Sequence, residues 1–175
     1  MQTRLATSED LPALKALMAE SIGQLQADFL TPSQVEASHG VMGIDTQLVR
    51  DGTYFIVEID GEIAGCGGWS RRTTLYGGDH STKLRDDAML DPAHDAARVR
   101  AMYTHPNFTR RGVGRAILAA SEAAARAEGF SRVELMATLS GEPLYRACGY
   151  EQVERVQSPA INGVHVPLVL MSKAL

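Results

Sequence analysis

One stretch of the sequence indicates both the fold and the chemistry: Thr104-His-Pro-Asn-Phe-Thr-Arg-Arg-Gly-Val-Gly-Arg-Ala-Ile-Leu118. A predicted strand ends here, and after a short loop a helix begins at Gly112 and Gly114, where the absence of side chains leaves the backbone open to a ligand. The first N–H groups of a helix have no partner inside it, and the helix dipole places partial positive charge there. Further donors come from three arginines: Arg110, Arg111 and Arg115. We therefore predict a phosphate or pyrophosphate site at this helix N-terminus.

Three kinds of phosphate site must be distinguished. A P-loop requires G-x-x-x-x-G-K-[ST], and the stretch has neither that spacing nor the lysine. A dinucleotide-binding G-x-G-x-x-G motif is not complete either, because Ile117 stands where its third glycine belongs. The third possibility is the pyrophosphate arm of coenzyme A.

The stretch resembles the signature of the GNAT (GCN5-related) N-acetyltransferases, V-x-P followed by [QR]-x-x-G-x-[GA] at a helix N-terminus. The chain has Thr104-His-Pro106 and then Thr109-Arg-Arg-Gly-Val-Gly114, with Thr109 in place of the usual Gln or Arg. A second family motif is matched by Leu144-Tyr-Arg-Ala-Cys-Gly-Tyr150, with leucine for the usual phenylalanine. Ser140 stands where the family often has asparagine. The resemblance spans residues 98–150.

This resemblance implies the fold and the reaction. It implies one N-acetyltransferase domain over residues 1–175, an α/β fold with a mixed, mostly antiparallel sheet of about six to seven strands. Helices flank the sheet, and its central strands splay apart at the acetyl-CoA site. The implied activity is transfer of an acetyl group from acetyl-CoA to a primary amine of a small molecule or peptide, without a metal. The implied cofactor-binding residues are Met102, Tyr103, Thr104, Thr109, Arg110, Arg111, Gly112, Val113, Gly114, Arg115 and Ser140.

The chemistry of the reaction assigns roles within this set. An oxyanion is best stabilised by a backbone N–H, which the resemblance places around Met102–Thr104. The departing thiolate needs a proton, and a phenol with an ordinary pKa of about 10 suits that task, so Tyr145 is the predicted general acid. The base is not identified by the sequence. Its candidates are Glu134, Asp79, His80, Asp86 and Asp87.

Composition restricts the partners. The chain has 175 residues, with 17 Lys and Arg against 21 Asp and Glu, a net charge of −4 that argues against nucleic-acid binding. It has no apolar run of the roughly 20 residues that a membrane span requires, and its N-terminus does not resemble a secretory signal, so we expect a cytoplasmic protein. Cys66 and Cys148 have no disulfide-like or zinc-like spacing. A homodimer is possible.

Two functions other than catalysis are also compatible with these residues: a catalytically silent module that binds or senses acyl-CoA, and a nucleotide- or dinucleotide-binding protein.

Hydrophobic periodicity predicts the remaining elements. We expect strands over residues 2–6, 53–59, 62–69, 98–104 and 132–137 and a terminal hairpin of 150–158 and 164–172. Helices are expected from Leu11, twice between Thr31 and Asp51, and over 113–127 and 142–147. The three glycines of 62–69 indicate a close backbone approach.

Two further features are interpreted without a catalytic role. The polar insertion 77–95 is interpreted as a solvated, partly disordered loop rather than a substrate lid. For Trp69 we favour a place at the edge of the core over one in the acceptor pocket.

Overall fold

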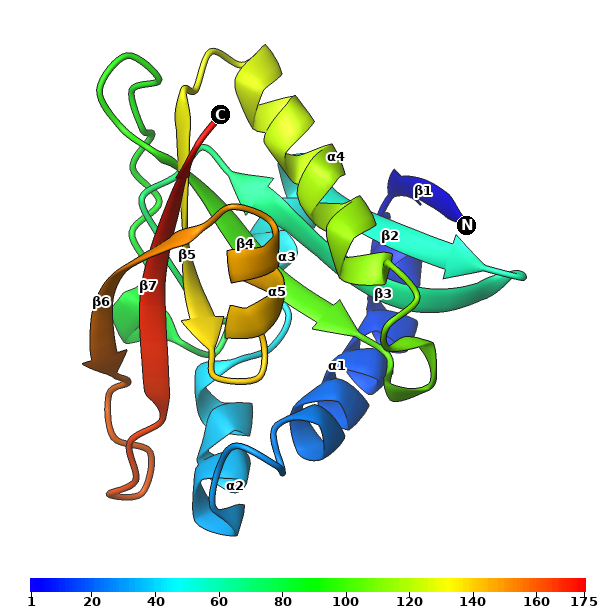
Figure 1. Ribbon diagram of the computed structural model, residues 1–175, viewed down its shortest axis with the longest axis vertical. Helices are drawn as coiled ribbons and strands as arrows, with labels where there is room; N and C mark the ends of the chain where they lie inside the picture. Colours follow the sequence, from blue (N-terminus) through cyan, green and yellow to red (C-terminus); the bar gives the residue numbers. More distant parts are fainter.

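The computed structural model describes all residues, 1–175, as a seven-stranded sheet with helices on both faces (Figure 1). The strands are β1 (Gln2–Leu5), β2 (Tyr54–Ile59), β3 (Glu62–Ser70), β4 (Ala97–Thr104), β5 (Arg132–Thr138), β6 (Glu151–Gln157) and β7 (Pro167–Ala174). The α-helices are α1 (Leu11–Leu25), α2 (Pro32–Val41), α3 (Thr46–Arg50), α4 (Val113–Ala127) and α5 (Glu142–Ala147). Short 3-10 turns occur at Ser8–Asp10, Thr82–Leu84 and Pro106–Phe108. The expected mixed, mostly antiparallel α/β sheet is confirmed.

The centre of the sheet is open at one end. The strand order is β1-β2-β3-β4-β5-β7-β6, and β4 with β5 is the parallel pair, joined only at Ala97–Val133 and Arg98–Glu134. Beyond these residues the two strands diverge towards their C-terminal ends, as Figure 1 shows. The expected splayed central strands are therefore present, and they leave the second half of β4 without a neighbour on that side.

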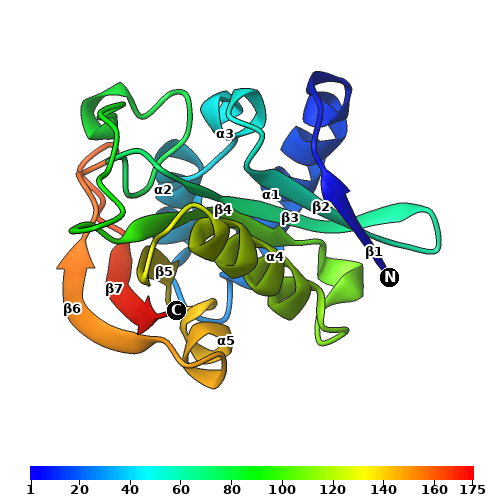
Figure 2. The same cartoon turned by 90° about the horizontal axis from the view of Figure 1, so that it is seen from above.

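Helix α4 lies across one face of the sheet, whereas α1 and α2 lie on the other (Figure 2). The glycines of β3 allow α4 to approach. A Cβ at Gly65 would lie 2.4 Å from the Val113 side chain, and one at Gly67 would lie 2.8 Å from Ile117. The predicted close approach is thus between strand and helix, and it brings the N-terminus of α4 near the end of β4.

The buried face of α4 differs from the simplest sequence pattern. Helical spacing predicts an apolar stripe of Val113, Ile117, Ala120, Ala124 and Ala127. The buried residues are instead Val113, Ile117, Leu118, Ser121 and Ala125. The helix packs against two core clusters, and the one that contains Trp69 also holds Phe130, with the two rings edge to face. The core position predicted for Trp69 is confirmed, since its side chain is buried.

The insertion 77–95 is more ordered than the sequence suggests, so its interpretation as partly disordered is wrong. Thr74 and Asp86 exchange two hydrogen bonds of 3.0 and 2.9 Å across it. Arg85 donates to the buried carboxylate of Asp45 at 3.0 Å and to Asp87 at 3.2 Å. These long-range contacts tie the insertion to α3 and to the loop after β3, and a polar composition gives no sign of them.

Candidate active site

The end of β4 is shaped by a bulge. The β3–β4 register shifts between Cys66 and Gly68, and opposite this point Ala101 has a left-handed backbone with φ of 50°. The Tyr54 hydroxyl donates to the Ala101 carbonyl at 2.6 Å and holds this conformation. The bulge re-aims the backbone of Met102–Thr104 where β4 leaves β5.

The N-terminus of α4 carries unsatisfied donors. Its first helical hydrogen bond runs from the Ala116 N–H to the Gly112 carbonyl, and no backbone N–H group from Arg110 to Arg115 donates to a protein acceptor. Arg110 and Gly112 are left-handed, with φ of 62° and 84°. Left-handed residues in such a loop create concave sets of N–H groups that bind anions. The predicted anion site therefore has the expected backbone.

A cleft of about 690 Å³ joins these two features. Its lining includes ten of the eleven predicted cofactor-binding residues: Met102, Tyr103, Thr104, Thr109, Arg110, Gly112, Val113, Gly114, Arg115 and Ser140. The exception is Arg111, which is stacked over the Phe108 ring at 5.2 Å instead. Since Thr109 donates its hydroxyl to the Pro106 carbonyl, that side chain is already engaged within the loop. The dimensions of the cleft and its free N–H groups fit a long anionic coenzyme.

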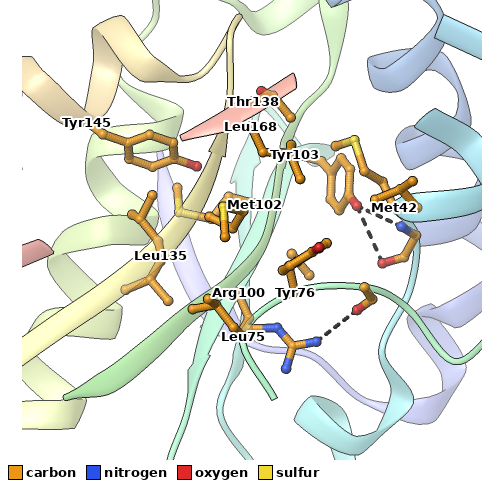
Figure 3. Close-up of a pocket in the computed structure, with 16 residues that line it drawn as sticks. Met42, Leu75, Tyr76, Arg100, Met102, Tyr103, Leu135, Thr138, Tyr145 and Leu168 are labelled. Atoms are coloured by element: carbon orange, nitrogen blue, oxygen red, sulfur yellow. Dashed lines mark hydrogen bonds between the residues drawn. The ribbon is translucent and has the colours of Figure 1, made fainter. Parts of the chain in front are cut away.

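A smaller pocket of about 80 Å³ adjoins the cleft. Figure 3 shows its walls: Met42 from the end of α2, Leu75 and Tyr76 from the loop after β3, and Leu135 and Leu168 from β5 and β7. Most of the lining is hydrophobic. Residues that border both the pocket and the cleft are Met42, Met102, Tyr103, Thr138 and Tyr145. These shared residues mark the place where a coenzyme and a second substrate would meet.

Tyr145 occupies that place. Its ring is buried edge to face against Tyr150, and its hydroxyl points towards Met102 in Figure 3 without a hydrogen-bond partner in the protein. Burial, with a smaller contribution from Cys148, raises the pKa of Tyr145 above its ordinary value. The phenol is therefore protonated throughout the neutral pH range and available as a donor.

Unlike Tyr145, Tyr103 has a hydrogen-bond partner for its hydroxyl within the protein. Its hydroxyl accepts from the Gly43 N–H at 2.9 Å, which joins β4 to the segment after α2. Its side chain therefore has a structural partner, and the role implied for this residue rests on its backbone.

The candidate bases do not reach the site. Glu134 is ion-paired with Arg98 and borders neither cavity, about 13 Å before Thr138 on β5 at the usual strand rise. The four candidates of the insertion are occupied elsewhere. Asp79 accepts from Thr46, His80 contacts the Gly40 carbonyl, Asp86 accepts from Ala88, and Asp87 pairs with Arg85. The alternation of residues along β5 shows on which face of the sheet Glu134 lies, but it cannot show that Arg98 is its neighbour there.

Several cavity residues were not predicted from the sequence. They are the turn residues Gln26, Asp28 and Phe29, the pocket residues Met42 and Tyr76, and the buried Arg100. None belongs to a motif, so no signal in the sequence marks them. No three His, Cys, Asp or Glu side chains are placed to hold a metal ion, and no helix is long and apolar enough to cross a bilayer.

Comparison with known proteins identifies the family. The sequence model of the acetyltransferase (GNAT) family matches residues 19–150, which is 132 of the 175 residues and includes both motifs. The chain belongs to the GNAT family. It is an N-acetyltransferase by this membership. The comparison with curated proteins gives no match.

Solved structures show the same fold at low sequence identity. A GCN5-related N-acetyltransferase of Rhodopseudomonas palustris has a TM-score of 0.72 and 22% identity, covering 99% of this chain and 95% of that one. A ribosomal-protein-alanine N-acetyltransferase of Brucella melitensis has a TM-score of 0.65 and 21% identity, covering both chains completely (100%). The PaiA N-acetyltransferase of Thermoplasma acidophilum, crystallised in complex with coenzyme A, has a TM-score of 0.65 and 13% identity, covering 99% and 98%. The GNAT fold is thus shown over the whole chain.

Proposed function

We propose that this GNAT protein transfers the acetyl group of acetyl-CoA directly to a primary amine, with Tyr145 as the general acid. The observation that carries the proposal is the position of Tyr145, which borders both the large cleft and the small apolar pocket. A thioester supplies an activated acyl carbon. The amine first loses a proton to solvent, and its nitrogen then bonds to that carbon while the carbon–sulfur bond breaks. The sulfur takes the phenolic proton of Tyr145, and the second proton, released by the nitrogen as the amide forms, passes through solvent and restores the phenol.

The chain's own groups would support each step. The N–H groups from Arg110 to Arg115 would hold the diphosphate, with Arg110 and Arg115 adding charge at the cleft wall. The backbone of the bulged end of β4 would supply the donor for the oxyanion. The small pocket, lined mainly by hydrophobic side chains, would leave little room for water beside the acyl carbon and so limit hydrolysis.

Tyr145→Phe tests the proposal. We expect kcat for thiol release to fall by about 10²–10⁴-fold, the usual contribution of a general acid, while the affinity for coenzyme A stays unchanged. Thermal stability should also be retained, because the lost hydroxyl has no hydrogen-bond partner in the protein. Tyr150→Phe is the control for loss of a neighbouring phenol, although this variant also removes a hydrogen bond of 3.0 Å to Glu122. Its ring contacts that of Tyr145 but borders neither cavity, so its kcat should match the parent protein.

Two results would oppose the proposal. Parental turnover by Tyr145→Phe would exclude the phenol as the acid. Binding of coenzyme A by the parent protein without thiol release against any amine in a broad panel would favour a silent sensor.

A further inference from the structure

The charges around the large cleft are divided between its walls. The arginines that border it, Arg110 and Arg115, lie at the N-terminus of α4. Asp28, in the turn between α1 and α2, is the single carboxylate that borders either cavity. In Figure 1 this turn and the N-terminus of α4 lie on different sides of the end of β4. The cleft therefore offers an anion site at one wall and a negative charge at another.

Asp28 is free to bind a ligand. Its side chain is exposed and takes part in no ion pair or side-chain hydrogen bond in the protein. Its neighbour Phe29 is 49% exposed and borders the same cleft. Four other large hydrophobic residues are similarly exposed, but none of them borders either cavity. An uncompensated carboxylate beside an exposed aromatic ring suits a cation that has an apolar part.

Gln26 adds a second polar group to this wall. It is 3% exposed, and its Nε2 donates to the sulfur of Met42 at 3.3 Å. Because a thioether has no hydrogen to donate, the amide nitrogen must face it, and Oε1 is left as a buried acceptor without a partner. A buried, unsatisfied oxygen is costly and often marks a functional site. Its partial negative charge adds to that of Asp28, and Met42 connects it to the apolar pocket.

We propose that the turn Gln26–Phe29 recognises the acceptor, and that the acceptor is a primary amine on an apolar or aromatic skeleton with no carboxylate beside the amine. This inference rests on the proposed acetyl transfer. Asp28 attracts the ammonium ion into the cleft and repels a neighbouring carboxylate, and Phe29 contacts the skeleton. The amine then loses its proton and reacts beside Tyr145. The small pocket, whose lining is mainly hydrophobic, receives the group next to the reacting centre.

The test compares 2-phenylethylamine with L-phenylalanine, which has the same skeleton and an added carboxylate. Thiol release at saturating acetyl-CoA should show kcat/KM at least about tenfold higher for 2-phenylethylamine, a factor equivalent to 1.4 kcal/mol. Asp28→Asn should raise the KM for this amine about tenfold and leave the KM for acetyl-CoA unchanged, and Asp28→Lys should invert the preference. Glu62→Gln is the matched control, because it changes the net charge equally at an exposed residue outside both cavities.

Gln26→Met separates recognition from structural support. An apolar side chain of similar shape removes the unsatisfied oxygen, so we expect an unchanged or higher Tm together with a higher KM for the amine. A lower Tm with an unchanged KM would show that Gln26 is only structural.

The outcomes distinguish the two proposals. Equal kinetics of Asp28→Asn and Glu62→Gln, or a preference of the parent protein for L-phenylalanine, would overturn this inference and leave acetyl transfer intact. Absence of thiol release with every amine would overturn both.

Discussion

Asp45→Asn should destabilise the protein strongly, because it leaves a buried arginine without its counter-charge. Asp45 and Arg100 are 1% and 2% exposed, and they are joined at 2.8 Å. The pKa of Arg100 is lowered by burial, which shows how unfavourable this cation is without its partner. Breaking a buried pair from one side costs about 3–5 kcal/mol, a large part of the 5–15 kcal/mol that stabilises a typical domain.

Two comparison variants, Arg100→Met and Asp87→Asn, distinguish an uncompensated buried charge from the simple loss of an ion pair. Arg100→Met should cost less than Asp45→Asn, because Asp45 keeps Arg85 at 3.0 Å and the Gln47 N–H at 3.0 Å. Asp87→Asn removes a half-exposed partner of Arg85 and should cost less than about 1 kcal/mol.

The assay is urea unfolding followed by circular dichroism, with Tm as a second measure. For a chain of this length, the loss from Asp45→Asn corresponds to a fall in Tm of roughly 6–20 °C. A free energy of unfolding for Asp45→Asn within about 1 kcal/mol of the parent value would refute the reasoning. So would a greater loss in Arg100→Met than in Asp45→Asn.

Three further predictions concern pH, packing and the coenzyme. Hydrogen bonds from Arg4 lower the pKa of Asp10 in the folded protein. The ionised Asp10 therefore stabilises the fold above its unfolded pKa of about 4, and this stabilisation is lost as the pH falls further. Arg4→Met should make the free energy of unfolding less dependent on pH in the acid range. Gly65→Ala would place a Cβ 2.4 Å from a valine methyl of α4, so we expect a loss of about 1–3 kcal/mol in urea titrations. Arg115→Ala should weaken coenzyme A binding in calorimetry and reduce its salt dependence, whereas Arg111→Ala, which alters a residue outside the cleft, should not.

Much of the fold follows from local patterns that the tertiary structure leaves unchanged. The Asp60-Gly61 and Asn162-Gly163 turns, and the helix ends at Gly129 and Gly149, lie at positive φ, which glycine adopts freely and which Asp and Asn tolerate. The predicted anion site also follows from local sequence, since a loop, two glycines and the start of a helix are consecutive in the chain. Local chemistry is sufficient there because the donors are backbone N–H groups of neighbouring residues.

The proposed acceptor side of the site could not be predicted in the same way. Its walls come from the α1–α2 turn, the end of α2, the loop after β3, and strands β5 and β7, which only folding brings together. Glu134 shows how far the sequence alone can go. Its position on a strand is predicted from the sequence, but its ion pair with Arg98 depends on the short parallel contact between β4 and β5.

Consecutive residues therefore indicated the family, the backbone predicted to bind phosphate and the candidate catalytic tyrosine, because each depends on spacing along one segment. Which carboxylate faces the cleft, and which polar atoms stay unpaired, depend on long-range packing and on the distances between elements. For that reason Asp28 and Gln26 became visible only when the chain was folded, whereas Gly112 and Gly114 could be recognised in the linear sequence.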